Sequence, residues 1–167
     1  ADLGAAVQLA VLENDQEQLA WLERVWEEIH EKYLYPTGSL SLKEQLVTPT
    51  DEPNGHHQET CATVEWLLFC HRLYLATGKA RYQHAIEDAV YNALLGAQSS
   101  DGLKWMYFTP LKYEKKWFSG GTRCCYHSGP RGIARLPLMV YCTDRDGLRV
   151  DLFEASTAQL EVSGVPL

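Results

Sequence analysis

Apolar residues recur three and four positions apart over most of the first hundred residues, a spacing that places them on one side of a helix. Asn14-Asp15 is a typical helix start, and Pro36 and Gly78 follow two of the expected helix ends. The pattern predicts four helices, over residues 5–12, 14–33, 60–77 and 81–98.

The predicted helices form two similar hairpins. At an offset of 64 residues, Leu22 matches Ile86 and Glu23 matches Glu87. Repeated helical hairpins are typical of toroids and solenoids. The positions expected to be buried are Cys61, Val64, Leu67, Leu68, His71 and Leu75 in the third helix, and Tyr82, Ala85, Ile86, Ala89, Val90 and Leu94 in the fourth.

The other segments lack helical periodicity. Residues 39–58 contain two prolines and Asn54-Gly55, which predict a long loop, and long ordered loops are often functional. Later in the chain, Gly120-Gly121 leads a predicted loop to Cys124-Cys125. We expect short strands at 103–108, 115–118, 149–153 and 157–162, and a short helix at 132–141.

Length and charge narrow the choice of function. With 167 residues, 46% of them hydrophobic, the chain has material for one domain, or one domain and a fragment of another. A helix is predicted almost at once, at residues 5–12, so we expect the chain to be part of a longer protein. The formal charge of −7 argues against nucleic acid and anionic membranes as partners. The most apolar stretch, residues 64–75, is too short to span a bilayer.

The five cysteines favour a reducing compartment. Their number is odd, and Cys124 and Cys125 are adjacent, which disfavours a disulfide scaffold. We therefore expect a cytoplasmic protein. Cys70 and Cys142 lie in apolar runs and are expected in the core.

Three thiols and one carboxylate are candidates for a metal site. Glu59 and Cys61 lie at the start of the third predicted helix, and Cys124 and Cys125 follow a glycine pair. One oxygen and three sulfur ligands suit tetrahedral zinc, although inert cysteines are the alternative.

Other candidates are open to two interpretations. Glu44 lies in the long loop, where a solvated carboxylate is the alternative to a functional one. The His56-His57 pair is either an exposed loop pair or a source of a metal ligand or substrate contact. The aromatic residues near Cys124, among them Tyr107, either stack on sugars or fill the core.

In combination, these residues resemble the β-L-arabinofuranosidase family of glycoside hydrolases, family 127. The resemblance depends on the order of Tyr35-Pro36-Thr37-Gly38, Glu44, Asp51-Glu52-Pro53-Asn54, Glu59-Thr60-Cys61-Ala62, Glu87, Tyr91-Asn92, Tyr107, Pro110-Leu111 and Cys124-Cys125. It implies a mainly α fold, part of an (α/α)6 barrel made of helical hairpins (residues 1–142), followed by the first strands of a β-sandwich domain (143–167).

The resemblance also implies roles for individual residues. Glu59, Cys61, Cys124 and Cys125 match the zinc ligands, Cys124 matches the nucleophile and Glu44 the general acid/base. Tyr107 and His57 are expected to contact the substrate. The chain departs from the family at Tyr126-His127-Ser128 after the thiol pair, at Glu52, and by one residue between Glu44 and Glu59. The resemblance also implies that the histidines that hold the sugar in the family belong to an early part of the barrel that we expect to lie outside this chain.

The sequence therefore predicts a retaining glycosidase that releases β-L-arabinofuranose or a related sugar from a carbohydrate substrate. The alternative is a non-catalytic, zinc-stabilised helical module that binds carbohydrate or protein. An isomerase on a similar barrel is disfavoured by the few histidines. Part of a barrel would expose apolar helix faces, so self-association is a further expectation.

Overall fold

The computed structural model describes residues 2–50, 56–117, 123–144, 147–162 and 165–166. By contacts the chain divides into two compact units, residues 1–132 and 133–167, which are described separately. The loop signals Asn54-Gly55 and Gly120-Gly121, the motif residues Asp51–Asn54 and the strand residue Phe118 lie outside the described residues.

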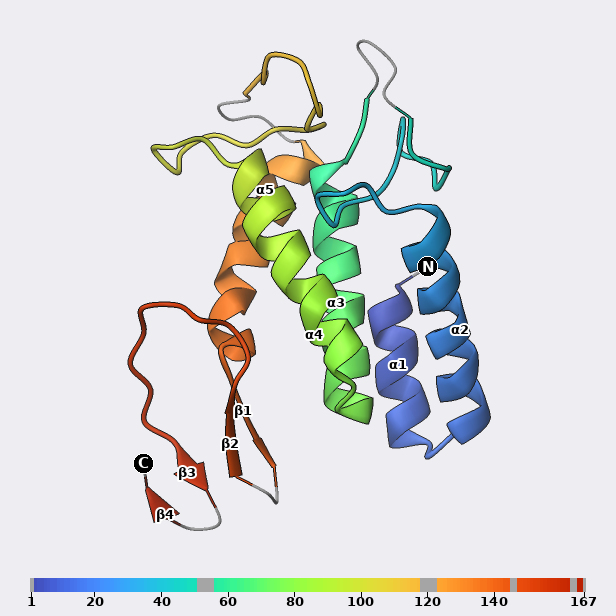
Figure 1. Cartoon of the computed structure of the whole chain (residues 1–167), viewed down its shortest axis with the longest axis vertical. Coiled ribbons are helices and arrows are strands. Elements are labelled where there is room, and N and C mark those ends of the chain that lie inside the picture. Colours follow the sequence, from blue (N-terminus) through green and yellow to red (C-terminus); the bar gives the residue numbers. More distant parts are fainter. Residues whose placement is uncertain (1, 51–55, 118–122, 145–146, 163–164, 167) are drawn as a thin grey trace. The chain divides into compact units, whose positions relative to one another are not determined.

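The first unit consists of helices arranged as hairpins, as predicted. Helices α1 and α2 form the first hairpin, and α3 and α4 form the second, which is extended by the π-helical η1 and the 3₁₀ turn η2. The described parts of the segments 33–59 and 98–123 lie at the same end of this unit, at the top of Figure 1. The bounds are Leu3–Leu12 (α1), Gln16–Lys32 (α2), Thr60–Thr77 (α3), Ala80–Asp88 (α4), Ala89–Leu94 (η1) and Leu95–Ala97 (η2).

Local sequence signals set these helix ends. The Asp2 and Asp15 carboxylates accept hydrogen bonds from the amides of Ala5 and Gln18, at 3.0 and 2.9 Å, and so cap α1 and α2. Gly78 ends α3 with φ of 67°, a conformation that glycine adopts without strain. The four predicted helices are thereby confirmed.

Helix α3 is buried more completely than predicted. Leu75 is 53% exposed and Leu68 and His71 are half-buried, whereas Trp66, Phe69, Leu73 and Tyr74 are buried. The expectation of a single apolar face is wrong because α1 and α4 both pack against α3. The six buried positions predicted for the fourth helix are confirmed.

The thiol pair begins a helix rather than lying in a loop. Helix α5 (Cys124–Arg135) starts eight residues before the predicted 132–141 helix, and the 3₁₀ turn η3 (Leu136–Met139) follows. Gly129 and Gly132 lie inside this helix and allow close packing. A Cβ atom at Gly129 would lie 2.2 Å from the Trp105 ring, and one at Gly132 would lie 2.9 Å from Val64. Tertiary contacts here outweigh the low helix propensity of glycine.

The strands predicted at 103–108 and 115–118 do not form in the described residues, and the later ones are shorter than expected. Residues 103–108 make only the isolated bridges Gln98↔Trp105 and Glu59↔Phe108. In the second unit, β1 (Tyr141–Asp144) pairs antiparallel with β2 (Gly147–Val150), and β3 (Glu161–Val162) with β4 (Val165–Pro166). Cys142 is half-exposed in β1, so its predicted core position is wrong, because a two-stranded ribbon does not enclose it. In the described part of the chain, no helix has the length and apolar character needed to cross a membrane.

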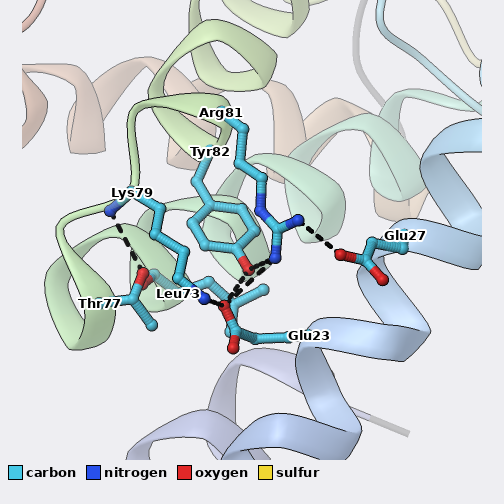
Figure 2. Close-up of polar contacts among 7 residues, drawn as sticks. All are labelled: Glu23, Glu27, Leu73, Thr77, Lys79, Arg81 and Tyr82. Carbon is cyan, nitrogen blue, oxygen red and sulfur yellow. Dashed lines mark hydrogen bonds and ion pairs between the residues drawn. The ribbon is translucent and has the colours of Figure 1, made fainter.

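A polar network joins the two hairpins (Figure 2). One oxygen of Glu23, on α2, accepts hydrogen bonds from Lys79 Nζ at 2.5 Å and from Tyr82 Oη at 2.6 Å. Arg81 bonds Glu27 at 2.5 Å, and its guanidinium lies 5.2 Å from the centre of the Trp26 ring. Burial alone would raise the pKa of Glu23, but the bonds from Lys79 and Tyr82 lower it overall. The carboxylate therefore stabilises the packing of α2 against the second hairpin.

We expect Glu23→Gln to lower the free energy of unfolding by about 1–3 kcal/mol. Tyr82 and Lys79 would lose a charged acceptor, and so would Arg81, whose Nη2 lies 3.3 Å from the same oxygen. Since the pKa is lowered in the folded protein, this stabilisation is present above the ordinary value of 4.5 and is lost as the pH falls below it. Urea unfolding at pH 7 and pH 4 measures both effects. The control is Glu28→Gln, which breaks an exposed pair with Lys32 and should cost less than about 0.5 kcal/mol. Equal effects of the two variants would contradict the role of the network.

Candidate active site and metal centre

Four potential metal ligands meet between the N-termini of α3 and α5. Glu59 immediately precedes α3 and Cys61 lies in its first turn, while Cys124 and Cys125 are the first residues of α5. One ligand atom from each of the four lies within 4.8 Å of the others. Helix N-termini carry partial positive charge, which favours thiolates and carboxylates. The structure thus brings together the four residues that the sequence predicted as ligands.

The spacing within this cluster fits zinc. The sulfur atoms of Cys61 and Cys125 are 3.3 Å apart, and those of Cys124 and Cys125 are 4.0 Å apart. A carboxylate oxygen of Glu59 lies 3.6 Å from Cys125 Sγ and 3.9 Å from Cys124 Sγ. Ligands of a tetrahedral zinc ion, with zinc–sulfur bonds of about 2.3 Å, lie about 3.8 Å from one another. The three sulfurs and one oxygen therefore have the chemistry and the separations of a zinc site.

Glu59 and Cys61 are fixed through the backbone at the start of α3. The Glu59 amide donates to Ser41 Oγ at 3.1 Å, and the Thr60 amide donates to the Tyr107 carbonyl at 3.0 Å. The Glu59 side chain makes no capping bond to the helix, so its carboxylate is available to the cluster. Ser128, on the next turn of α5, accepts a bond from Cys61 Sγ at 3.3 Å, a contact that the sequence did not indicate.

The acidic groups of the cluster perturb one another. Burial, followed by the charge of Cys61, raises the pKa of Glu59 to about 7. The bond to Cys125 lowers the pKa of Cys61 to about 5, and the same bond raises the pKa of Cys125. The raised pKa values favour protonated Glu59 and Cys125 in the absence of a cation, and a divalent ion would replace those protons. Buried Cys70 differs: burial raises its pKa, and Trp26 Nε1 donates to its sulfur at 3.1 Å, which marks it as structural.

Glu44 lies in a tight turn near the cluster. Leu42 and Gln45 exchange two backbone hydrogen bonds of 2.9 Å, and φ is 49° at Lys43 and 63° at Glu44. Positive φ at both central residues is the pattern of a type I′ turn, which normally contains Asn and Gly. Two larger residues there store backbone strain, which is concentrated at functional sites in proteins.

Tyr107 links Glu44 to the thiol pair. Its hydroxyl donates to Glu44 Oε1 at 2.5 Å and lies 3.6 Å from Cys124 Sγ. The bond to Glu44 raises the pKa of Tyr107, so the hydroxyl stays protonated and remains a donor. The predicted acid/base, the predicted nucleophile and the metal ligands are therefore contiguous.

The two histidines of the long loop have different positions. His57 is 1% exposed, and its Nδ1 lies 2.9 Å from Tyr35 Oη inside the fold. His56 instead lines an open cleft of about 410 Å³, together with Lys43, Glu44, Tyr107, Phe108 and Arg123. Nothing in the sequence singled out Lys43, Phe108 or Arg123.

Comparisons with known proteins support the same interpretation. The family model of the β-L-arabinofuranosidase catalytic domain, glycoside hydrolase family 127, matches residues 3–138. The crystal structure of a family 127 β-L-arabinofuranosidase from Geobacillus stearothermophilus T6 is similar with 25% identity and a TM-score of 0.84 over 98% of this chain. A second family 127 β-arabinofuranosidase gives 27% identity, the same TM-score and the same coverage.

A further solved glycoside hydrolase, 21% identical over 90% of the chain with a TM-score of 0.70, shares the fold. The chain spans only 29% and 27% of the length of the first two structures. No curated protein matches the sequence. The predicted fold class, helical hairpins of an α/α barrel, is confirmed. Since the family model covers most of the chain, including all four clustered ligands and Glu44, the chain belongs to the family 127 β-L-arabinofuranosidase catalytic domains of the glycoside hydrolases.

Proposed function

We propose that the protein containing this chain is a retaining glycoside hydrolase that releases β-L-arabinofuranose or a related sugar. Cys124 would be the nucleophile and Glu44 the general acid/base. The observation that carries this proposal is the continuous contact from Glu44 through the Tyr107 hydroxyl to Cys124 and the S3O cluster. Two solved relatives, 25% and 27% identical to this chain, are described as arabinofuranosidases.

In the first step, protonated Glu44 donates its proton to the leaving oxygen while the Cys124 thiolate attacks the anomeric carbon. The bond from the carbon to the leaving oxygen breaks and a carbon–sulfur bond forms. In the second step, ionised Glu44 takes a proton from water, which displaces the sulfur with overall retention. Tyr107, whose hydroxyl donates to Glu44, would orient that carboxyl group and contact the sugar.

Glu59, Cys61, Cys124 and Cys125 would hold zinc, which when bound lowers the pKa of the thiols and keeps Cys124 as thiolate. In this proposal residues 1–142 are part of the α/α-barrel catalytic domain and residues 143–167 begin a β-sandwich domain. All five cysteines are unpaired thiols, which supports a reducing, cytoplasmic setting.

Cys124→Ser and Glu44→Gln are each expected to reduce hydrolysis of an aryl β-L-arabinofuranoside by the full-length protein at least ~10³-fold, because each removes one of the two reacting groups. Steady-state kcat/KM measures the loss. Cys142→Ser replaces a half-exposed thiol outside the cluster and serves as the control. Activity that survives Cys124→Ser would contradict the thiolate mechanism. A zinc-loaded parent without hydrolysis on any arabinofuranoside would favour the non-catalytic module.

Zinc affinity is expected to fall at least tenfold between pH 8 and pH 6. The pKa of Glu59 in the metal-free protein is raised to about 7, so protons compete with the metal for this carboxylate as the pH falls through that value. Chelator competition at several pH values measures the slope, which should become shallower in Glu59→Gln. Glu65→Gln, on the same helix but outside the cluster, should leave the slope unchanged. Affinity that does not vary with pH would show that Glu59 is not a ligand.

A further inference from the structure

Ser128 places a buried hydroxyl group against one ligand of the cluster. It lies in α5, four residues after Cys124 and three after Cys125, so its side chain is on the same side of the helix as both thiols. Its exposed fraction is 9%, and its Oγ lies 3.3 Å from the sulfur of Cys61, on α3. The hydroxyl therefore bridges the two helices that carry the cysteine ligands.

The Cys61 sulfur is the only hydrogen-bond partner of the Ser128 hydroxyl within the described part of the chain. A hydroxyl side chain inside a helix commonly bonds the carbonyl four residues earlier, as Thr77 of α3 does with Leu73 at 2.7 Å. Ser128 does not form this bond with Cys124 and bonds a ligand sulfur instead. Its hydroxyl is thus committed to the cluster rather than to its own helix.

The packing of α5 fixes the position of Ser128. Gly129, the next residue, lies so close to Trp105 that a Cβ atom would be 2.2 Å from the ring, and at Gly132 a Cβ atom would be 2.9 Å from Val64 of α3. These contacts leave α5 little freedom to move away from α3. Ser128 also belongs to residues 126–128, where the chain departs from the family, so the contact comes from this chain's own sequence.

Zinc binding would reverse the direction of this hydrogen bond. In the metal-free cluster, Cys61 Sγ donates to Ser128 Oγ. A cysteine ligand of zinc is a thiolate and has no proton, so the hydroxyl must then donate to the sulfur. A serine hydroxyl can change from acceptor to donor by rotating its hydrogen, while its oxygen stays in place. Hydrogen bonds of this kind orient metal ligands, and their loss typically lowers metal affinity about 10–100-fold.

We propose that Ser128 is a positioning residue of the zinc site, whose hydroxyl donates to the Cys61 thiolate and thereby increases the affinity for zinc. The inference rests on the proposed function, since it requires zinc at the four ligands. Ser128 acts through Cys61 and not on the reacting atoms. The nucleophile Cys124 has a different hydroxyl contact, with Tyr107 at 3.6 Å.

The test removes the hydroxyl of Ser128 in the full-length protein. We expect Ser128→Ala to lower the affinity for zinc, measured by chelator competition, about tenfold. Cobalt(II) in place of zinc supplies a spectroscopic signature. The sulfur-to-cobalt charge-transfer band should move to lower energy in Ser128→Ala, because a thiolate without its hydrogen bond holds its electrons less tightly. The visible bands of tetrahedral cobalt should remain, which shows that the ligand set is intact.

Thr77→Val is the matched control, because it removes a hydroxyl group at the opposite end of α3. It should change neither the zinc affinity nor the charge-transfer band. An affinity and a band that are unchanged in Ser128→Ala, or equal changes in the control, would overturn the inference and leave the zinc site standing. A parent protein without any sulfur-to-cobalt band would contradict the zinc site, and the inference with it. Hydrolysis does not enter this test, so its loss or retention bears on the proposed mechanism alone.

Discussion

Gly129 allows α5 to lie so close to Trp105 that a Cβ atom at this position would be 2.2 Å from the indole ring. Gly132 permits a similar approach to Val64 of α3 one turn later. This packing places the first turn of α5 beside the first turn of α3, and all four clustered ligands lie within these two turns or next to them. The cluster therefore depends on contact between α3 and α5, whose ligands Cys61 and Cys124 are more than 60 positions apart in the sequence.

The close approach of several acidic groups limits how many of them can be ionised at the same time. Three thiols and the Glu59 carboxylate lie within 4.8 Å of one another, and Glu44 reaches Cys124 through a single hydroxyl group. Such groups cannot all ionise at neutral pH unless a cation is present. Burial is the main cause of the raised pKa of Glu59, and the charge of Cys61 adds to it. A divalent metal would both hold the cluster together and keep a thiolate available for chemistry.

The sequence predicted local features well and long-range ones poorly. Helix ends at Asp15 and Gly78 follow from side-chain and backbone chemistry within a few residues. The start of α5 at Cys124 was missed because the glycines there serve contacts with Trp105 and Val64, which no local pattern reveals. The metal ligands were found by residue type and by resemblance to a family. His56 and His57 differ in position because of how the long loop folds onto residues 107 and 108. The same folding brings Lys43 into the cleft with Arg123.

In the proposed mechanism, Glu59, Cys61, Cys124 and Cys125 bind one zinc ion at the junction of α3 and α5. X-ray absorption at the zinc edge, recorded on the purified full-length protein, would reveal these ligands. The account predicts three sulfur ligands at about 2.3 Å and one oxygen at about 2.0–2.2 Å. It also predicts that Cys61→Ser reduces the sulfur count to two. A coordination shell made mainly of nitrogen and oxygen, or a sulfur count unchanged in Cys61→Ser, would contradict it.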